Sequence, residues 1–318
     1  MFKPHDPETP PEEGWIPPCP ASGAGCHAWL YRAVNALVAG GWPDEAIDAW
    51  VNRWMSRPPQ PSEVSNTLRK VKVEINNPTE ERFSIPKPPL NEALIKEYGS
   101  QPDTSIEEIM SYSPIAVEGL SSADHLRVLY GDDEKTIVFT NEQSQGQLVW
   151  SHETPDALLE NAVRNNKSGA WMLLNPVSGE SKYVDRLGKE SRRSEETLTK
   201  YKYCLIEADN TPVEKWLTIL KNLSLPIKSI TLSGNQSAHS IVEVNAKDKK
   251  HWQKIASDLA AIVVPLGACS GSLTAVRLTR LAQVMRPDTG KMQKLIYLNQ
   301  EPRMTKLIRA SSPKPPLK

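Results

Sequence analysis

The sequence predicts an α+β protein in which a small helical unit precedes a larger unit of mixed strands and helices. Three observations support this prediction. Residues 25–76 repeat apolar side chains at helical spacing, residues 77–114 show no periodicity, and residues 115–302 mix strand-like segments and helices without a regular strand–helix repeat. A chain of 318 residues with 39% hydrophobic and 24% charged residues has enough material for two globular units.

The first part of the chain is predicted to hold a leader, a helical unit and a linker. Residues 1–24 are rich in proline, which removes backbone donors, and we expect a flexible leader without the pattern of a signal peptide. Within 25–76, apolar spacing predicts helices at 27–41, 43–55 and 61–75. These three helices would form a small accessory bundle with an ordinary packed core. Residues 77–114 are predicted to be a linker because proline and polar residues interrupt every period.

The second unit is predicted to span residues 115–302, with a basic disordered tail at 303–318. Its alternating segments predict strands, and its longer amphipathic segments predict helices. The order is a helix at 125–131, a hairpin at 136–151, a helix at 155–166, strands at 169–176 and 201–209, a helix at 213–223, strands at 227–232 and 240–244, a helix at 248–267, and strands at 274–281 and 293–299. Irregular mixing of this kind favours α+β over a doubly wound sheet.

Composition and charge exclude some classes of protein. Basic and acidic residues balance at 38 each, but Lys and Arg outnumber Asp and Glu between 277 and 309, which indicates a phosphate-binding surface or a solvated face. No apolar run approaches the ~20 residues of a membrane span. The cysteines are too few and scattered for a disulfide scaffold, so we expect a cytoplasmic protein. They are Cys19, Cys26, Cys204 and Cys269. Cys19, Cys26 and His27 lack the fourth ligand of a structural zinc site, which we do not expect.

Two acids and a histidine are candidates for chemistry. Glu207 and Asp209 follow an apolar strand at i and i+2, so their side chains share a face. Paired carboxylates repel one another unless a cation lies between them, and Mg²⁺ or Mn²⁺ prefers such oxygen ligands together with substrate phosphates. His239 ends the polar insert "SGNQSAH" between two predicted strands. Taken alone, an acid pair at a strand end is common in solvated loops, and a strand histidine is more often a packed core residue.

The order of these segments resembles the catalytic core of the archaeo-eukaryotic primase (AEP) superfamily, the primase-polymerases. The stretch "IEAD", a helix, a strand, "SGNQSAH" and a further strand follow one another as they do in that family. The resemblance covers about 115–300 and implies an RRM-like sheet with helices. It implies that Glu207 and Asp209 bind metal, and that Ser237 and His239 contact the phosphates of the incoming nucleotide. Ser233 matches the same loop.

The resemblance continues in "RLTRL", where Arg277 and Arg280 match the family's arginines and offer planar donors for phosphate oxygens. The family's proline-glycine pair is replaced by Ala282 and Gln283. Within the histidine loop, a glycine and a lysine of the family are replaced by Asn235 and Gln236.

The third metal ligand of the family is an aspartate, and Cys269 stands at the expected position. A thiol is a poor ligand for a hard, oxygen-seeking ion. The resemblance therefore predicts the fold more firmly than it predicts the activity.

The resemblance implies a DNA primase or DNA-directed polymerase-like nucleotidyltransferase acting in DNA replication. It would use Mg²⁺ or Mn²⁺ and NTP or dNTP on a single-stranded DNA template, with a replicative helicase as a further partner. The predicted catalytic residues are Glu207, Asp209 and His239, and the predicted nucleotide-binding residues are Ser233, Ser237, His239, Arg277 and Arg280. Arg192, Arg193, Arg286 and Lys291 are predicted to contact nucleic acid.

Two other interpretations remain open. A degenerate relative would bind nucleotide or single-stranded DNA in a replication or defence complex without extending a primer; Cys269 and Gln236 favour it. An unrelated helical interaction protein would carry the acids and the histidine by accident. That last interpretation predicts that Glu207, His239 and Arg277 lie far apart in the folded chain.

Overall fold

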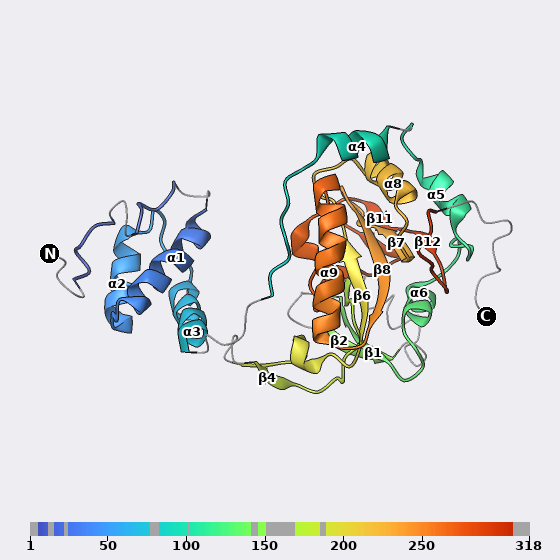
Figure 1. Ribbon diagram of the computed structural model, residues 1–318. Helices are drawn as coiled ribbons and strands as arrows, with labels where there is room; N and C mark the ends of the chain where they lie inside the picture. The colour runs from blue at the N-terminus through green and yellow to red at the C-terminus, as the bar shows by residue number, and fades with distance from the viewer. Residues whose placement is uncertain are drawn as a thin grey trace. The chain divides into compact units, whose positions relative to one another are not determined.

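The structure is a computed structural model that describes residues 6–11, 16–21, 25–76, 83–100, 102–140, 146–150, 169–184 and 189–307. The chain divides into two compact units (Figure 1). The first comprises residues 1–82 and 182–191, and the second comprises residues 83–181 and 192–318. Each unit has its own core, and each is described by itself below.

The first unit is built on helices α1 (Cys26–Ala39), α2 (Asp44–Trp54) and α3 (Glu63–Asn76), as the apolar spacing predicted. Their apolar faces form one core, in which the rings of Trp29 and Trp50 stack with centroids 5.8 Å apart. A hairpin of β4 (Lys182–Val184) and β5 (Lys189–Ser191) belongs to the same unit. Strands of three residues show no alternation, so the hairpin was missing from the prediction.

The described parts of the proline-rich leader are held by the bundle, which differs from the predicted flexible segment. Ile16 is buried in the core of the first unit. The indole Nε1 of Trp29 donates to the Pro17 carbonyl at 2.6 Å, and that of Trp50 donates to the Thr9 carbonyl at 2.7 Å. These backbone carbonyls of the leader accept hydrogen bonds from two indole donors of the bundle and so tie the leader to it.

The central sheet of the second unit is antiparallel, with the strand order β12-β7-β8-β6 within the described residues. Its strands are β6 (Tyr201–Ile206), β7 (Ile227–Leu232), β8 (Ala238–Ala246) and β12 (Leu295–Leu298). Helices α8 (Val213–Asn222) and α9 (Lys249–Val263) cover one face (Figure 1). Cys204 and Ile206 pack in the core beneath these helices, and Tyr203 and Leu205 pack in a core on the other face. Burial of both faces explains why β6 is almost wholly apolar.

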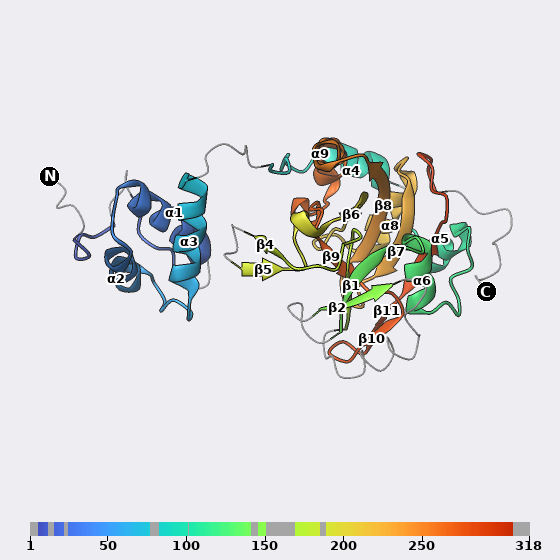
Figure 2. The same ribbon diagram turned by 90° about the horizontal axis from the view of Figure 1, so that it is seen from below.

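A second antiparallel sheet, with the order β2-β1-β3-β9, contributes to the core on that other face (Figure 2). Its strands are β1 (Lys135–Phe139), β2 (Gly146–Trp150), β3 (Trp171–Leu173) and β9 (Leu278–Arg280), and helix α6 (Ser122–Leu129) shares the core. A separate hairpin joins β10 (Val284–Arg286) to β11 (Lys291–Gln293). Short 3₁₀ turns are η2 (Glu195–Thr197), η3 (Val264–Leu266) and η4 (Ser270–Ser272).

The segment predicted as a linker at 77–114 contains two helices, α4 (Glu92–Gly99) and α5 (Ile106–Tyr112). The Asn91 and Ser105 side chains cap their N-termini, and Ile109 is buried in the core beneath α8 and α9. The second unit accordingly begins at residue 83 rather than near residue 115. These helices of eight and seven residues span only about two turns each and lie among prolines and polar residues, which is why periodicity missed them.

The other predicted elements of the second unit are present, and the α+β class is confirmed. The helix predicted at 155–166 and most of the predicted tail at 303–318 lie outside the described residues. In the part of the chain that the structure describes, we find no helix with the length and apolar character needed to span a membrane.

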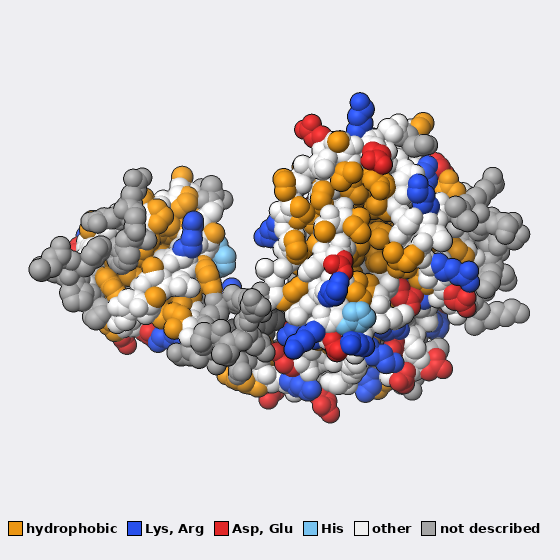
Figure 3. Space-filling model, viewed as in Figure 1, with side chains coloured by type: hydrophobic (Ala, Val, Ile, Leu, Met, Phe, Trp, Pro, Cys, Tyr) orange, Lys and Arg blue, Asp and Glu red, His pale blue; other side chains and the backbone are white. Residues whose placement is uncertain are grey.

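Surface lysines gather around the N-terminal end of α9 on the face shown in Figure 3. Lys249 pairs with Glu195 at 2.9 Å, and Lys254 pairs with Asp258 at 2.8 Å. Part of this positive charge is therefore balanced locally, as on an ordinary solvated face.

Candidate functional site

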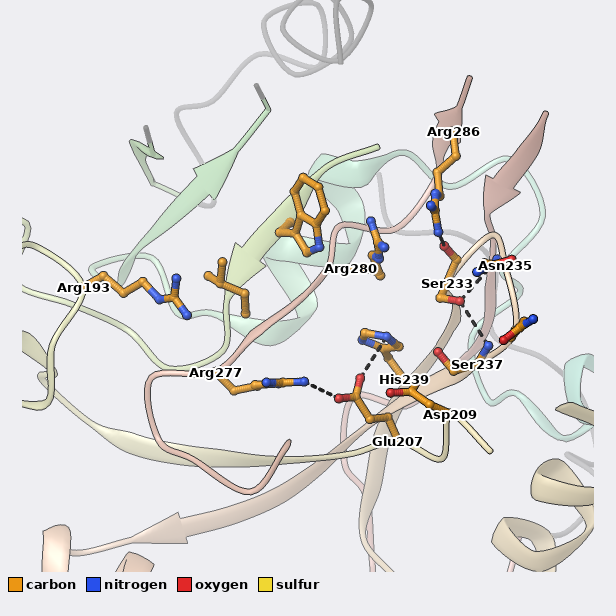
Figure 4. A pocket seen from close by; sticks show the side chains of 13 residues that line it. Arg193, Glu207, Asp209, Ser233, Asn235, Ser237, His239, Arg277, Arg280 and Arg286 are labelled. Carbon is orange, nitrogen blue, oxygen red and sulfur yellow. Dashed lines mark hydrogen bonds and ion pairs between the residues drawn. The ribbon is translucent and has the colours of Figure 1, made fainter. Parts of the chain in front are cut away.

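A pocket of about 360 Å³ opens where the ends of β6, β7 and β8 meet β9 and β10 (Figure 4). It combines several arginines with two carboxylates and one histidine. The lining residues are Trp171, Arg193, Glu207, Asp209, Ser233, Asn235, Gln236, Ser237, His239, Arg277, Leu278, Arg280 and Arg286. Segments separated by more than 100 residues thus supply one concave polar surface, which is the usual character of a ligand site.

The acid pair lies at the end of β6. Glu207 is buried and Asp209 is exposed, although both line the pocket. The backbone N–H of Cys269 donates to the Glu207 carbonyl at 2.7 Å and fixes this strand end. The side chain of Cys269 is half-buried and is not part of the pocket lining.

Both oxygens of the Glu207 carboxylate have partners. Oε1 accepts a hydrogen bond from the Arg277 guanidinium, and Oε2 lies 3.1 Å from Nε2 of His239 (Figure 4). Only 3% of the Glu207 side chain is exposed. Because a buried charge needs a counter-charge, Arg277 is what stabilises ionised Glu207 in this arrangement.

His239, on β8, is held between Glu207 and Thr279. Its Nδ1 lies 3.1 Å from the Thr279 hydroxyl. Burial, together with the charges of Arg280 and Arg277, lowers the pKa of His239 to about 3, so the ring is neutral at pH 7. Because a carboxylate only accepts hydrogen bonds, we assign the ring hydrogen to Nε2, which faces Glu207, and Nδ1 then accepts from the Thr279 hydroxyl. The histidine therefore lies against the Glu207 carboxylate without adding charge.

The loop between β7 and β8 forms a tight turn. The Ser233 hydroxyl accepts from the backbone N–H groups of Asn235 at 3.3 Å and Ser237 at 3.2 Å. Gly234 has a φ of 70°, in the region that favours glycine. A Cβ there would lie 2.9 Å from Cδ of Arg286. Both the turn and the close approach of Arg286 therefore depend on glycine at this position.

The β10–β11 turn braces this loop from outside. The Arg286 guanidinium donates to the Ser233 carbonyl at 3.2 Å and forms a bidentate pair with Asp288, with contacts of 3.1 and 2.6 Å. The Thr289 hydroxyl donates to the Gly234 carbonyl at 2.7 Å. Asp288 is thus an ion-pair partner of Arg286.

Arg280 lies against Trp171, with its guanidinium 4.6 Å from the ring centroid. Burial lowers the pKa of Arg280 to about 10, with a further contribution from Arg286. Burial also lowers the pKa of Arg193, as does the charge of Arg277. Cations gathered at this density repel one another, so the pocket is suited to a ligand with several negative charges.

Most of the predicted site residues lie together. Arg193 and Arg286, predicted to contact nucleic acid, line the pocket, whereas Arg192 and Lys291 are exposed outside it. Sequence reasoning missed Trp171. Its position opposite Arg280 comes from the pairing of β3 with β9, which no local pattern reveals.

The carboxylate oxygens of the acid pair are the kind of ligand that a divalent cation binds. Glu207 and Asp209 offer carboxylate oxygens, which Mg²⁺ and Mn²⁺ prefer. Among the described residues, no group of three or more His, Cys, Asp or Glu side chains is placed to hold a metal ion. Both oxygens of Glu207 already have partners in this arrangement, so the two carboxylates fit a divalent cation only once one of those partners has moved.

Comparisons with known proteins give one distant likeness. No family model matches the chain, and no curated protein matches it. Among solved structures, the chain is similar to the AEP domain of the primase-polymerase (PrimPol) of cyanophage S-2L, with a TM-score of 0.40 and 16% sequence identity. The match covers 56% of this chain and 88% of that domain.

Proposed function

We propose that this chain is a primase-polymerase-like nucleotidyltransferase that binds an NTP or dNTP in the pocket and extends a strand on a single-stranded DNA template. The observation that carries the proposal is convergence: Glu207 follows β6, His239 lies on β8, Arg277 precedes β9, and Glu207 contacts both of the others. An accidental acid pair and histidine would have no reason to meet in a pocket lined with arginines. The proposed fold of the second unit is the RRM-like core of that superfamily.

In this proposal the arginines bind the triphosphate. Arg277, Arg280 and Arg193 present planar donors toward the pocket (Figure 4), and such donors match phosphate oxygens. Ser233 and Ser237 shape the loop that faces the same phosphates. A primer hydroxyl attacks the α-phosphate and pyrophosphate leaves, a reaction in which positioning and charge stabilisation supply most of the catalysis.

Glu207 and Asp209 would hold Mg²⁺ or Mn²⁺, which supplies charge neutralisation at the reacting phosphates when bound. His239 keeps the Glu207 carboxylate in place through Nε2–H. We further propose that exposed Arg192 and Lys291 contact the template backbone, which predicts binding that weakens with salt.

A second function is favoured by two specific observations. Glu207 is already paired with Arg277, and Cys269 stands where the resemblance implies a third carboxylate. A protein with this site would bind nucleotide without extending a primer. The pocket chemistry is the same in both cases, and the reaction is what differs.

Primer extension with Mn²⁺, together with nucleotide binding, tests both functions. We expect extension by the wild type and a loss of about 100-fold in Glu207→Gln, which removes a few kcal/mol of charge stabilisation. Glu301→Gln, at an exposed acid, is the matched control and should keep full activity. Nucleotide binding without extension, with extension gained in Cys269→Asp, would support the second function. Absence of both binding and extension would contradict the two proposals together.

A further inference from the structure

The Glu207 carboxylate cannot bind a cation in the arrangement described above without losing a partner. Arg277 holds Oε1, His239 lies against Oε2, and the side chain is almost completely buried. We propose that Arg277 occupies the position of a cation on Glu207, so that the site rejects free divalent ions and accepts the cation together with a nucleoside triphosphate. This inference rests on the proposed function and specifies the form in which the substrate binds.

The charge of the pocket supports this selection. Its lining residues include four arginines and two carboxylates, and one of the arginines, Arg286, is also paired with Asp288 outside the lining. The charged groups at the pocket therefore keep a net positive sign. A free divalent cation is repelled by this surface, whereas a triphosphate carrying one divalent cation has a net charge close to minus two. The pocket and the complex are thus opposite in sign.

Arg277 is the partner that can change position. Its side chain is 36% exposed, compared with 3% for Glu207. Its Nε is buried and has no hydrogen-bond partner within the described part of the chain. A phosphate group would give Nε and the terminal nitrogens a bidentate acceptor that the Glu207 oxygen alone does not provide.

The binding event is therefore an exchange of partners. As the triphosphate binds, the Arg277 guanidinium transfers from Glu207 to phosphate oxygens, and Oε1 becomes free for the cation that the phosphates bring. His239 stays on Oε2 and keeps the carboxylate oriented. Nucleotide and cation then bind with positive coupling, because each removes the obstacle to the other.

Two binding measurements test this exchange. Electron paramagnetic resonance counts Mn²⁺ bound to the full-length protein in the absence of nucleotide, and tryptophan fluorescence follows a non-hydrolysable nucleoside triphosphate with and without Mn²⁺. For Arg277→Gln we expect binding of free Mn²⁺ about tenfold tighter than in the wild type, because a positive charge beside the carboxylate is lost. Binding of the nucleotide should become weaker in the same variant. Arg303→Gln, at an exposed arginine, should match the wild type in both measurements.

Opposite shifts in the two affinities identify the exchange, since misfolding would weaken both. The inference is overturned if Arg277→Gln binds free Mn²⁺ no more tightly than the wild type, or if the wild type binds Mn²⁺ equally well with and without nucleotide. Either result leaves the proposed function standing as long as the nucleotide still binds. A wild type that binds no nucleotide under any condition contradicts the proposed function itself.

Discussion

At the scale of single residues, Gly234 connects backbone conformation to the phosphate-facing loop. Its positive φ allows the turn in which the Ser233 hydroxyl accepts two backbone N–H groups. The absence of a side chain lets Arg286 approach the loop. The sequence predicted a polar insert between two strands here, and the close approach of Arg286 to Gly234 depends on the β10–β11 hairpin, which was not predicted.

The substitution Gly234→Ala tests both the left-handed backbone and the space that Arg286 needs. We expect a loss of about 1–2 kcal/mol for the left-handed backbone, and a further loss from the contact with Arg286. Gly290→Ala is the matched control, because Gly290 has a φ of 65° and open space around the added Cβ. Urea unfolding should show the larger loss in Gly234→Ala, and nucleotide titration should show weaker binding in that variant alone. Equal losses of stability in the two variants would mean that the Arg286 side chain moves away from the added Cβ with no loss of free energy.

Gln283 keeps a left-handed backbone conformation although it is not a glycine. The resemblance places a glycine of the family here, and Gln283 keeps a φ of 60°, which is uncommon for a residue with a side chain. Its amide donates to the Leu120 carbonyl at 3.1 Å and accepts from the backbone N–H of Leu295 at 3.3 Å. These hydrogen bonds offset part of the backbone strain, a compensation that depends on two segments distant in sequence.

At the scale of elements, the long amphipathic helices and buried strands were predictable, and the helices α4 and α5 and the hairpins β4–β5 and β10–β11 were not. α8, α9 and β8 bury enough apolar side chains to leave a clear period, and β6 forms a nearly continuous apolar run. The strands β10 and β11 contain three residues each and are defined by pairing with one another. Their role as a brace for the β7–β8 loop depends on Arg286, Asp288 and Thr289, whose contacts are tertiary.

Asp288→Asn tests this brace. The substitution removes the charge that holds the largely buried Arg286 guanidinium, and we expect only a small loss in the free energy of unfolding because the Asp288 side chain is exposed to solvent. Nucleotide binding should weaken severalfold, since the loop loses its outer support. Asp258→Asn, which breaks an exposed pair with Lys254, should change neither quantity. Unchanged nucleotide affinity in Asp288→Asn would show that the loop holds its shape without the hairpin.

At the scale of the whole molecule, two units could be predicted, but their limits could not. Apolar spacing separated the first helices from the mixed second part. The second unit begins at residue 83 instead of the predicted residue 115, because α4 and α5 pack on the core of that unit. The convergence of the site residues followed from the family resemblance rather than from any local pattern. Trp171 was out of reach because strand register depends on the complete sheet.

Two buried histidines make the stability of the second unit depend on pH. Burial lowers the pKa of His125 and of His239 from 6.5 to about 3. Between pH 6.5 and pH 3 the unfolded chain binds protons that the folded chain does not. The free energy of unfolding is therefore highest above pH 6.5 and decreases as the pH falls below it. Each histidine lowers the free energy of unfolding by up to about 1.4 kcal/mol for every pH unit in that range. Carboxylates whose pKa is lowered in the fold, such as Glu63 with a pKa of about 2, lose their contribution to the free energy of unfolding only below about pH 4.5.

The interval from pH 6.5 to 4.5 therefore isolates the histidines, and urea unfolding followed at pH 7, 6 and 5 measures their effect. We expect the free energy of unfolding of the second unit to fall steadily over this series. His125→Gln keeps a donor for the Ser229 hydroxyl, which lies 3.0 Å from Nε2 of His125, and removes one titrating group. The variant should lose about half of the pH dependence. A free energy that stays constant from pH 7 to 5 would mean that both histidines take up protons in the folded chain as they do in the unfolded chain, and the lowered pKa of His125 and His239 would be contradicted.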